Sequence, residues 1–559
     1  MEEGNSPGIV DKITEFDEFA GSRESKRNTG STRSIFQKEV AIMTGAEIIL
    51  TTAADAGIEI CFANAGTTEL PLVAALDAVK TIRPVLGLFE GVCTGAADGY
   101  ARMKQKPALT LLHLGPGLAN GIANLHNARR ARSPMLNIVG QHATWHLHAD
   151  PPLSMDIASL ARTVSGWYKQ SASTEDLARD TAEALAASLY GQISTLVAPA
   201  DLQWTEQKPD KVTLPQHAFD KIDEPTIAEA CRLLKEARKP SLILDGRALR
   251  TVGLAAAAKI RAKTGCDLLR INFPAYCDCG TGLPAVRPIP YVPAQAEALL
   301  SVYDAAILAG TDEPVAFFGY KGGKSFLLNG NQRRLRIDTD RQDAQDALEA
   351  LAQALNGETG TARISSILTK YALPEPASGR LDAEKMCATI AALQPEQCIL
   401  VDEGITSSAP YYSYAPFLKP HSQLCLTGGA IGQGMPLALG AALACPDRKV
   451  INIQADGSAM YTIQSLWSQA REKADVITVI CSNRKYSIIE LECLAAGYSA
   501  LGAKTRALMD LTKPAIDWVN LSRGLGVPAA SVTTAEGLAA AFRAALKESG
   551  PHLIEAILQ

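Results

Sequence analysis

Short apolar runs alternate along most of the chain with segments whose apolar residues have the spacing of a helix. Residues 108–113, 240–244 and 476–480 are examples of such runs from three separate parts of the sequence. Runs of this length, rich in Leu, Ile and Val, predict strands that are buried on both faces. Because these strands alternate with helices, the sequence predicts an α/β protein with parallel sheets.

Two polar linkers divide this pattern into three parts. We expect α/β domains over 42–205, 222–357 and 376–559, and the second of them has the strand pattern of a Rossmann-like domain. Residues 1–41 are polar and mixed in charge, which predicts a flexible N-terminal extension. Three domains agree with the length of 559 residues.

The composition narrows the class of protein. Hydrophobic residues make up 47% of the chain, and the net charge of −5 is accompanied by no basic block, so we expect no nucleic-acid partner. No apolar run has the length that spans a membrane, and Met1-Glu2-Glu3-Gly4 does not resemble a secretory signal. The 12 cysteines have neither zinc-binding nor disulfide spacing. We therefore expect a cytoplasmic enzyme with reduced thiols.

The candidate chemistry centres on two neighbouring predicted strands in the last third of the chain. The strand over 449–453 is followed by a turn at Asp456, and the strand over 476–480 is followed by Asn483. A helix is predicted between them over 463–473, so both side chains fall at the carboxyl ends of parallel strands, where ligands bind. The sequence therefore predicts that Asp456 and Asn483 lie close together.

These residues have the chemistry of a cation site. A hard divalent cation prefers oxygen ligands and can bind phosphate oxygens together with those of the protein. The protein oxygens can come from the side chains of Asp456 and Asn483 and from the Lys485 carbonyl. Gly457 permits close approach of the backbone to a phosphate, and Ser458 offers a hydroxyl. The alternative is an Asp-Gly turn and an asparagine loop without a ligand, since both are common. The residues themselves leave the two interpretations open.

Ala455-Asp456-Gly457-Ser458, followed by Ser482-Asn483, resembles the diphosphate and Mg²⁺ motif of thiamine-diphosphate enzymes. The usual form of that motif is Gly-Asp-Gly and then Asn-Asn, so Ala455 and Ser482 depart from it while both metal-ligand positions are kept. The resemblance covers the chain from residue 42 onward and is strongest for the benzoylformate decarboxylase and acetolactate synthase branch. It implies a pyrimidine-binding domain, a Rossmann-like middle domain and a diphosphate- and Mg²⁺-binding domain, in that order.

In the first domain, the resemblance implies a role for two titratable side chains. Glu90 stands where the family has the glutamate that hydrogen-bonds N1′ of the cofactor's aminopyrimidine and assists deprotonation of C2. Its alternative is an acid at a helix start, stabilised by the helix dipole. His113 matches a proton-shuttling histidine of benzoylformate decarboxylase, and its alternative is a core histidine bonded to backbone. Thr67 takes the place of a serine that contacts the substrate, and we place it with Asn120 among the cofactor-binding residues.

In the third domain, the resemblance implies that the Gly429 carbonyl accepts from the cofactor's 4′-amino group and that Ile431 holds the cofactor bent. The alternative for this glycine-rich stretch is a plain turn. Ile488 and Ile489 are expected to form an apolar pocket beside C2. The full cofactor-binding set expected in this domain is Thr406, Gly428, Gly429, Ile431, Asp456, Gly457, Ser458, Asn483, Tyr486, Ser487 and Ile488.

The middle domain lacks two motifs. No Gly-x-Gly-x-x-Gly stands between a strand and a helix, so FAD, which some acetolactate synthases hold there, stays an alternative that the sequence does not support. The stretch 314–320 has no histidine where benzoylformate decarboxylase contributes a second one to its active site. In the first domain, His142, His146 and His148 lack metal-ligand spacing, and we interpret them as one face of a loop.

Together these features predict a thiamine-diphosphate- and Mg²⁺-dependent enzyme. We expect it to decarboxylate a 2-oxo acid and to join the product to a carbonyl acceptor, as acetolactate synthase does. Two alternatives stay open: a decarboxylase that releases aldehyde and CO₂, and a degenerate homologue that only binds the cofactor, which Ala455 and Ser482 would favour. In the family two chains complete each active site, so we expect a homodimer or homotetramer.

Overall fold

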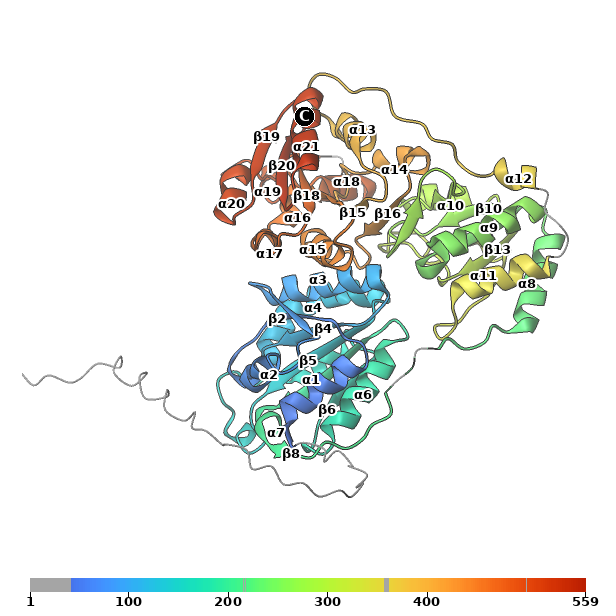
Figure 1. The fold of residues 1–559 in the computed structure, drawn as a ribbon. Helices are drawn as coiled ribbons and strands as arrows, with labels where there is room; N and C mark the ends of the chain where they lie inside the picture. Colours follow the sequence, from blue (N-terminus) through green and yellow to red (C-terminus); the bar gives the residue numbers. More distant parts are fainter. Residues whose placement is uncertain (1–41, 215, 217, 356–360, 499) are drawn as a thin grey trace, which may run out of the picture. The chain divides into compact units, whose positions relative to one another are not determined.

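The computed structural model describes residues 42–214, 216, 218–355, 361–498 and 500–559. The extension predicted over 1–41 lies outside the described residues. Three mainly parallel β-sheets, each accompanied by helices, follow one another along the chain (Figure 1). The prediction of an α/β fold with three α/β domains is confirmed.

The first domain is built on a sheet of six parallel strands. Its strands are β2 (Ile60–Asn64), β3 (Arg83–Leu86), β4 (Ala108–Leu112), β5 (Met135–Gln141), β6 (Trp167–Gln170) and β7 (Ile193–Pro199), in the order β3-β2-β4-β5-β7-β6. Its helices are α1 (Gly45–Asp55), α2 (Leu70–Ala75), α3 (Glu90–Lys104), α4 (Leu114–Arg130), α5 (Ile157–Arg162), α6 (Leu177–Ser188) and α7 (Ala200–Trp204). The short strands β1 (Met43–Thr44) and β8 (Glu206–Gln207) pair separately.

Both faces of this first sheet are buried. In β5, Leu136 and Ile138 belong to the core shared with α1 and α6, whereas Met135 and Val139 belong to the core shared with α3 and α4. Successive side chains of a strand point to opposite faces, so each face receives every second residue. Helices on both sides of the sheet therefore explain the nearly continuous apolar runs of the sequence.

The middle domain has a five-stranded parallel sheet in the order β12-β10-β9-β13-β14. Its strands are β9 (Pro240–Leu244), β10 (Asp267–Arg270), β12 (Arg287–Pro288), β13 (Ala305–Ala309) and β14 (Arg333–Arg336). Its helices are α8 (Glu224–Glu236), α9 (Thr251–Thr264), α10 (Pro293–Leu300) and α11 (Ala344–Ala354), and the short α12 (Thr361–Ser365) follows them. The strands predicted from apolar runs near 240 and 305 have these bounds.

The third domain holds the predicted metal loop. Its sheet has the order β11-β16-β15-β17-β18-β20-β19. The strands are β11 (Cys277–Cys279), β15 (Ile399–Glu403), β16 (His421–Cys425), β17 (Val450–Ala455), β18 (Val476–Ser482), β19 (Ala529–Val532) and β20 (His552–Ile557). The helices are α13 (Ala383–Leu393), α14 (Tyr411–Tyr414), α15 (Gly434–Ala444), α16 (Asp456–Ala459), α17 (Ser465–Glu472), α18 (Ser487–Ala495), α19 (Ala503–Ala507), α20 (Trp518–Gly524) and α21 (Ala535–Lys547).

One strand of the third sheet comes from the middle of the chain. β11 lies between β10 and β12 in sequence, yet it pairs antiparallel with the edge strand β16, with Cys277 opposite Gln423. All other pairs in this sheet are parallel. The segment 222–357, predicted as one domain, therefore also contributes an edge strand to the neighbouring sheet.

Glycines bring α3 and α15 into backbone contact. A Cβ added to Gly99 would lie 2.1 Å from the carbonyl oxygen of Leu437, and one added to Gly440 would lie 1.9 Å from that of Ala96. Neither helix could approach the other so closely with a larger residue at these positions. The small-residue run of α3 therefore contacts the third domain.

Leu114-Gly-Pro-Gly117 starts α4, since a proline in the first helical turn gives up no hydrogen bond. For a second glycine-containing stretch the local prediction was wrong. Asp456-Gly457-Ser458 was expected to be a turn, but Asp456 is the first residue of the short α16. Both glycine-containing stretches therefore start helices at the carboxyl ends of strands.

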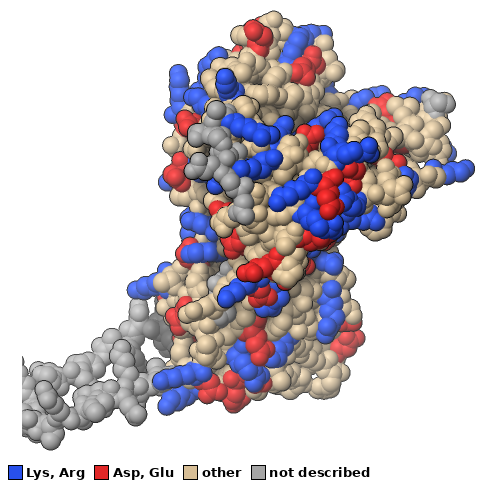
Figure 2. Space-filling model, turned by 90° about the vertical axis from the view of Figure 1, so that its right-hand side faces the viewer, with Lys and Arg blue, Asp and Glu red and all other residues tan. Residues whose placement is uncertain are grey.

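The surface shows no separate charged region on the face drawn in Figure 2, where basic and acidic side chains are intermixed. Arg336, for example, forms ion pairs with Asp312 and Asp340. Among the helices of the described residues, none has the combined length and hydropathy needed to cross a bilayer.

Candidate functional site

The predicted metal loop lies at the carboxyl ends of β17 and β18, which are parallel neighbours with Ala455 opposite Cys481. Asp456 follows the first strand directly and Asn483 follows the second. Oδ2 of Asp456 accepts a hydrogen bond from the backbone N of Arg484 at 2.6 Å, which ties the two segments together. The structure therefore brings together the two segments that the sequence proposed for the ligands.

Asp456 is a buried carboxylate with backbone partners only. It is 2% exposed, and burial raises its pKa to about 6, against the opposing effect of hydrogen bonds from the N–H groups of Arg484 and Gly457. In the described part of the chain, no lysine or arginine side chain forms an ion pair with it. A carboxylate that is desolvated but not neutralised fits a bound cation, which would stabilise its ionised form.

Asn483 and Lys485 are arranged around the same loop. Oδ1 of Asn483 accepts from the backbone N of Lys485 at 3.0 Å, and its Nδ2 donates to Oγ of Ser487 at 3.1 Å. An amide oxygen has two lone pairs, so Oδ1 keeps one for a metal. The oxygen donor set of Asp456, Asn483 and the Lys485 carbonyl therefore fits Mg²⁺ and, through it, a diphosphate.

The glycine of the motif is covered by a tyrosine. A Cβ added to Gly457 would lie 2.4 Å from the ring of Tyr486, so only glycine fits beneath that ring. Oγ of Ser458 donates to the Ala455 carbonyl at 3.1 Å and accepts from Nε2 of Gln454 at 2.8 Å. The Ser458 hydroxyl, expected at a phosphate, is thus held by protein groups in this structure.

The glycine-rich loop before α15 is fixed by a glutamate that sequence reasoning missed. Glu403, 1% exposed at the end of β15, accepts from the backbone N of Gly432 at 2.6 Å and from Nε2 of Gln454 at 3.0 Å. Burial raises its pKa. An acid in the last position of an apolar strand was the available signal, whereas the predicted site residue, Thr406, lies half-buried in the following loop.

The same loop is held by α4 of the first domain. Asn127 accepts from the backbone N of Ala430 at 3.2 Å and donates to its carbonyl at 2.7 Å. Nε2 of His126 lies 3.1 Å from the Gly428 carbonyl. Gly429 has a φ of +75° in the left-handed region that favours glycine, and the half-buried Ile431 follows. The loop is therefore rigidly placed between two domains of one chain.

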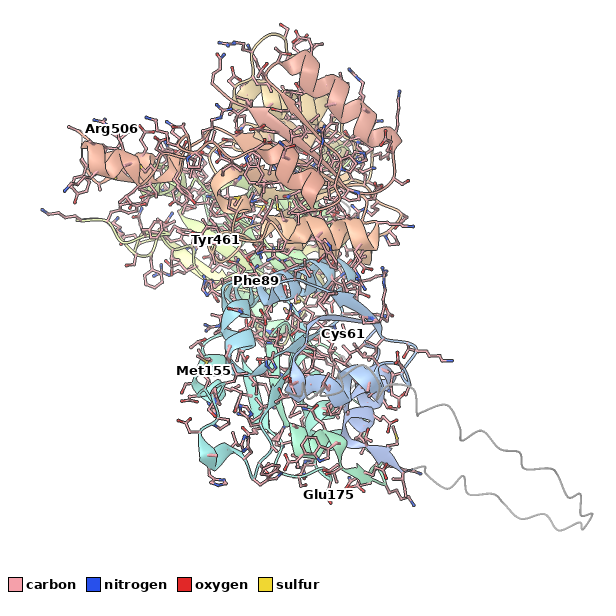
Figure 3. All side chains as sticks on the ribbon, turned by 90° about the vertical axis from the view of Figure 1, so that its left-hand side faces the viewer. Cys61, Phe89, Met155, Glu175, Tyr461 and Arg506 are labelled. Atoms are coloured by element: carbon pink, nitrogen blue, oxygen red, sulfur yellow. The ribbon has the colours of Figure 1, made fainter. Side chains whose placement is uncertain are left out.

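Glu90 and Asn120, both predicted site residues, contact each other. Glu90 is the first residue of α3 and is 8% exposed, and its Oε2 accepts from Nδ2 of Asn120 at 3.0 Å. Its Oε1 lies 3.0 Å from the position of a Cβ on Gly117, so the start of α4 leaves room for this carboxyl group. Phe89, labelled in Figure 3, precedes it as the N-cap residue of α3.

His113 is bound to a carboxylate and not to backbone, so the interpretation as a backbone-bonded core histidine is wrong. Its Nδ1 lies 2.7 Å from Oε2 of Glu69, and its side chain is 22% exposed. The hydroxyl of Thr68 lies 3.4 Å from the same nitrogen, whereas Thr67 is exposed and makes no recorded contact with His113. Glu69 was missed because its position after the strand end gave no pattern that distinguishes it from a surface acid.

A further side chain borders the start of α4. Met155, labelled in Figure 3, comes from the segment between β5 and α5, and its side chain would lie 2.4 Å from a Cβ on Gly115. It is 47% exposed, which is unusual for a large apolar residue. The sequence pattern gave no indication of this contact, because it joins separate loops.

The middle domain does not favour FAD. A cavity of about 170 Å³ lies at the carboxyl ends of β9, β13 and β14, which is smaller than a usual ligand pocket of roughly 300–1,000 Å³. Two of the arginines that line it, Arg247 and Arg132, already pair with Asp343 and Asp340. The cavity is therefore small for a dinucleotide, although Arg130 and Arg250 also line it and form no ion pair among the described residues.

Of the three histidines His142, His146 and His148, the first two lie close together. The rings of His142 and His146 are edge to face with centroids 5.9 Å apart, and burial lowers the pKa of His142. Across the described residues, no group of three or more His, Cys, Asp or Glu side chains is arranged to hold a metal. In the same residues, no hydrogen bond or ion pair joins Glu90 or His113 to Asp456 or Asn483.

Comparison with known proteins identifies the family to which the domains that carry these residues belong. Residues 43–161 match the model of the thiamine pyrophosphate enzyme N-terminal TPP-binding domain, and residues 405–556 match that of the C-terminal TPP-binding domain. The first match contains Glu90 and His113, and the second contains Asp456 and Asn483. The two groups of candidate residues therefore fall in the two cofactor-binding domains of that family.

Individual relatives agree over nearly the full length. A protein of Mycobacterium tuberculosis, provisionally named an acetolactate synthase large subunit, is 44% identical over 92% of this chain and 99% of its own. Benzoylformate decarboxylase of Pseudomonas aeruginosa is 28% identical over 89% of this chain and 96% of its own. The structure of a thiamine-diphosphate-dependent 4-hydroxybenzoylformate decarboxylase from Rhodococcus jostii superposes with a TM-score of 0.81 at 25% identity, over 92% of this chain and 99% of that one. The chain is therefore an enzyme that belongs to the thiamine pyrophosphate (thiamine diphosphate) family.

Proposed function

We propose that this enzyme decarboxylates a 2-oxo acid with thiamine diphosphate and Mg²⁺ and joins the acyl group to a second carbonyl compound, giving a 2-hydroxy ketone or acetohydroxy acid. The observation that carries the proposal is the 2.6 Å hydrogen bond between Oδ2 of Asp456 and the backbone N of Arg484. It draws the two ligand-bearing loops together at the carboxyl edge of a parallel sheet, where an anionic cofactor binds.

The third domain would hold the diphosphate end of the cofactor. Asp456, Asn483 and the Lys485 carbonyl would bind Mg²⁺, and the glycine-rich backbone before α15 would face the aminopyrimidine. Thiamine diphosphate, when bound, supplies a nucleophilic carbon that adds to the substrate carbonyl and accepts the electrons of the bond to the departing CO₂. The protein would orient the cofactor and the substrate relative to each other and exclude water from the site.

The first domain would supply the residues that transfer protons. Glu90 is buried enough to keep its carboxyl group out of water, and Asn120 holds that group by a hydrogen bond, so it would be available to the ring nitrogen of a bound cofactor. His113, held through Nδ1 by Glu69, presents Nε2 as the nitrogen that gives a proton to a substrate oxygen or takes one from it. Because no hydrogen bond or ion pair joins Glu90 or His113 to Asp456 or Asn483 within the described part of the chain, we propose a homodimer or homotetramer in which two chains complete each site. We also propose a cytoplasmic location, as expected from the sequence.

Carboligation is favoured over simple protonation by the lining of the middle domain. The segment 314–320 carries no histidine, and its Phe317 places an apolar ring against Gly429. An apolar lining that includes Ile488 would slow protonation of the acyl carbanion equivalent and leave time for a second carbonyl. The names of the decarboxylase relatives support the other candidate, a decarboxylase that releases aldehyde.

Product analysis separates these functions. The purified chain with thiamine diphosphate and Mg²⁺ is incubated with pyruvate, benzoylformate or branched 2-oxo acids, with and without an added aldehyde, while CO₂ and organic products are measured. Release of CO₂ together with a 2-hydroxy ketone supports the proposal. Aldehyde as the sole product at every acceptor concentration would leave a plain decarboxylase, and no CO₂ from any donor would leave a cofactor-binding homologue.

A further inference from the structure

An aromatic ring of the middle domain lies directly on the glycine-rich loop of the third. A Cβ added to Gly429 would lie 2.6 Å from Cζ and 3.2 Å from Cε1 of Phe317. The Gly429 backbone is the part of the chain that we assign to the cofactor's aminopyrimidine. Phe317 is therefore the middle-domain side chain that stands beside the reacting end of the proposed site.

Phe317 is held by other rings but is not covered by them. Its centroid lies 6.1 Å from that of Phe273, 5.5 Å from that of Tyr291 and 5.0 Å from that of Phe318, separations at which aromatic pairs attract. Nevertheless 42% of Phe317 is exposed. A large apolar ring that is fixed in orientation and open on one side is the kind of surface that binds an apolar group.

The helix after the metal loop is attached to the same aromatic cluster. Oε1 of Glu492 accepts from the hydroxyl of Tyr291 at 2.7 Å, and Oε2 accepts from that of Tyr320 at 2.8 Å. Burial, reinforced by Glu492, raises the pKa of both tyrosines, so they stay neutral donors. Tyr291 thus packs against Phe317 with its ring and holds α18 with its hydroxyl.

Helix α18 offers a second apolar surface. In the described part of the chain none of its residues is buried, although Ile489, Leu491 and Leu494 are large and apolar. It begins next to Tyr486, which covers Gly457 of the metal motif. The cluster of Phe317, Phe273 and Tyr291 and the α18 residues therefore lie beside the two loops that we assign to the proposed site.

We propose that Phe317, backed by Phe273 and Tyr291, is the wall on which the side chain of the donor 2-oxo acid packs, so that the enzyme selects aromatic or branched apolar donors over pyruvate. This inference rests on the proposed function and specifies its substrate class. Among the described residues no lysine or arginine stacks on these rings, and the Tyr291 hydroxyl donates to the Glu492 carboxylate. A donor with a second carboxylate would find no cation there and would meet the charge of Glu492.

The first test compares donors on three variants. We expect the ratio of kcat/KM for benzoylformate to that for pyruvate to fall roughly 10- to 100-fold in Phe317→Ala, because the pocket loses its apolar contact with the larger donor. Phe318→Ala is the matched control, since Phe318 touches the cluster without a recorded contact to Gly429, and its ratio should stay within about twofold of wild type. Tyr291→Phe keeps the ring and removes the bond to Glu492, so it should keep the preference.

A binding measurement keeps this inference separate from the proposed function. Mandelate and lactate, the unreactive 2-hydroxy counterparts of the two donors, are titrated into the chain loaded with thiamine diphosphate and Mg²⁺, with heat as the signal. Wild type should bind mandelate at least about tenfold more tightly than lactate, and Phe317→Ala should lose that difference. Equal binding of mandelate and lactate by wild type, or an unchanged preference for mandelate in Phe317→Ala, would refute the proposed role of Phe317 even if CO₂ is released. Absence of CO₂ release with a preference for mandelate would instead refute the proposed function alone.

Discussion

Nδ1 of His113 lies 2.7 Å from Oε2 of Glu69, a fully buried carboxylate. An ionised carboxylate can only accept, so Nδ1 is the donor, and Nε2 is the nitrogen left for a ligand. Glu69 is fixed in turn by the backbone N of Gly66 at 2.8 Å and the hydroxyl of Thr68 at 2.6 Å. The orientation and the tautomer of His113 are therefore set by its neighbours.

Replacing Glu69 with Gln should lower kcat/KM for 2-oxo acid turnover roughly 10- to 100-fold, a part of what acid–base catalysis contributes. The amide keeps the size of the side chain but replaces one of its two acceptor oxygens with a donor, so it should orient His113 less well. Steady-state kinetics check this, and thiamine-diphosphate binding should stay as in wild type.

The double variant Glu69→Gln with His113→Ala provides the control. Because Glu69 acts through His113, the double variant should lose no more activity than His113→Ala alone. Additive losses would show that Glu69 has a separate structural role and would contradict the prediction.

Replacing Glu90 with Gln should leave cofactor binding largely intact and slow the exchange of the C2 proton of bound thiamine diphosphate at least about 100-fold. An amide cannot act as the proton-transferring partner of the aminopyrimidine. Proton NMR after quenched deuterium exchange measures the rate. Asn120→Ala, which removes only the 3.0 Å hydrogen bond to Glu90, should give a smaller effect. Exchange at the wild-type rate in Glu90→Gln would remove Glu90 from this role.

Replacing Asp456 with Ala should abolish Mg²⁺-dependent binding of thiamine diphosphate, weakening it more than about 100-fold, because the diphosphate loses its bridging cation. Calorimetric titration with and without Mg²⁺ measures this. Asp447→Ala, an exposed acid in the turn before β17, is the control and should bind normally. Tight Mg²⁺-dependent binding by Asp456→Ala would refute the metal assignment.

His421 should make the protein sensitive to acid. Burial lowers its folded-state pKa to about 4, below the value of roughly 6.5 in an unfolded chain. The unfolded chain therefore binds the extra proton first, and stability falls as the pH drops from about 6.5 through 4, at up to about 1.4 kcal/mol per pH unit. The neutral side chain is held by the Lys419 carbonyl at 2.9 Å from Nδ1.

His421→Asn removes the titrating ring and keeps a donor for that carbonyl. Between pH 7 and 4.5 its melting temperature should fall less than that of wild type, even if it starts lower. The exposed His148 provides the control, because His148→Asn should keep the wild-type dependence. An identical pH dependence in wild type and His421→Asn would contradict the prediction.

The sequence by itself determined many of the strands and the nearness of the two segments that carry Asp456 and Asn483. Apolar runs such as the strand Pro240–Leu244 predict buried strands, because both faces of a parallel sheet are covered. Asp456 and Asn483 could be paired because one helix separates their strands, and strands joined in this way lie side by side in a parallel sheet. Local order in the chain was enough for both inferences.

Only the tertiary structure decided which side chains from distant segments meet. Glu69 against His113, Phe317 on Gly429 and the pairing of β11 with β16 all join segments whose proximity depends on how whole sheets and domains pack. Periodicity reports which face of an element is buried, but it carries no information on which distant residue covers that face. The loop proposed for the metal was therefore visible in the sequence, whereas the contact of Glu69 with His113 and that of Phe317 with Gly429 were not.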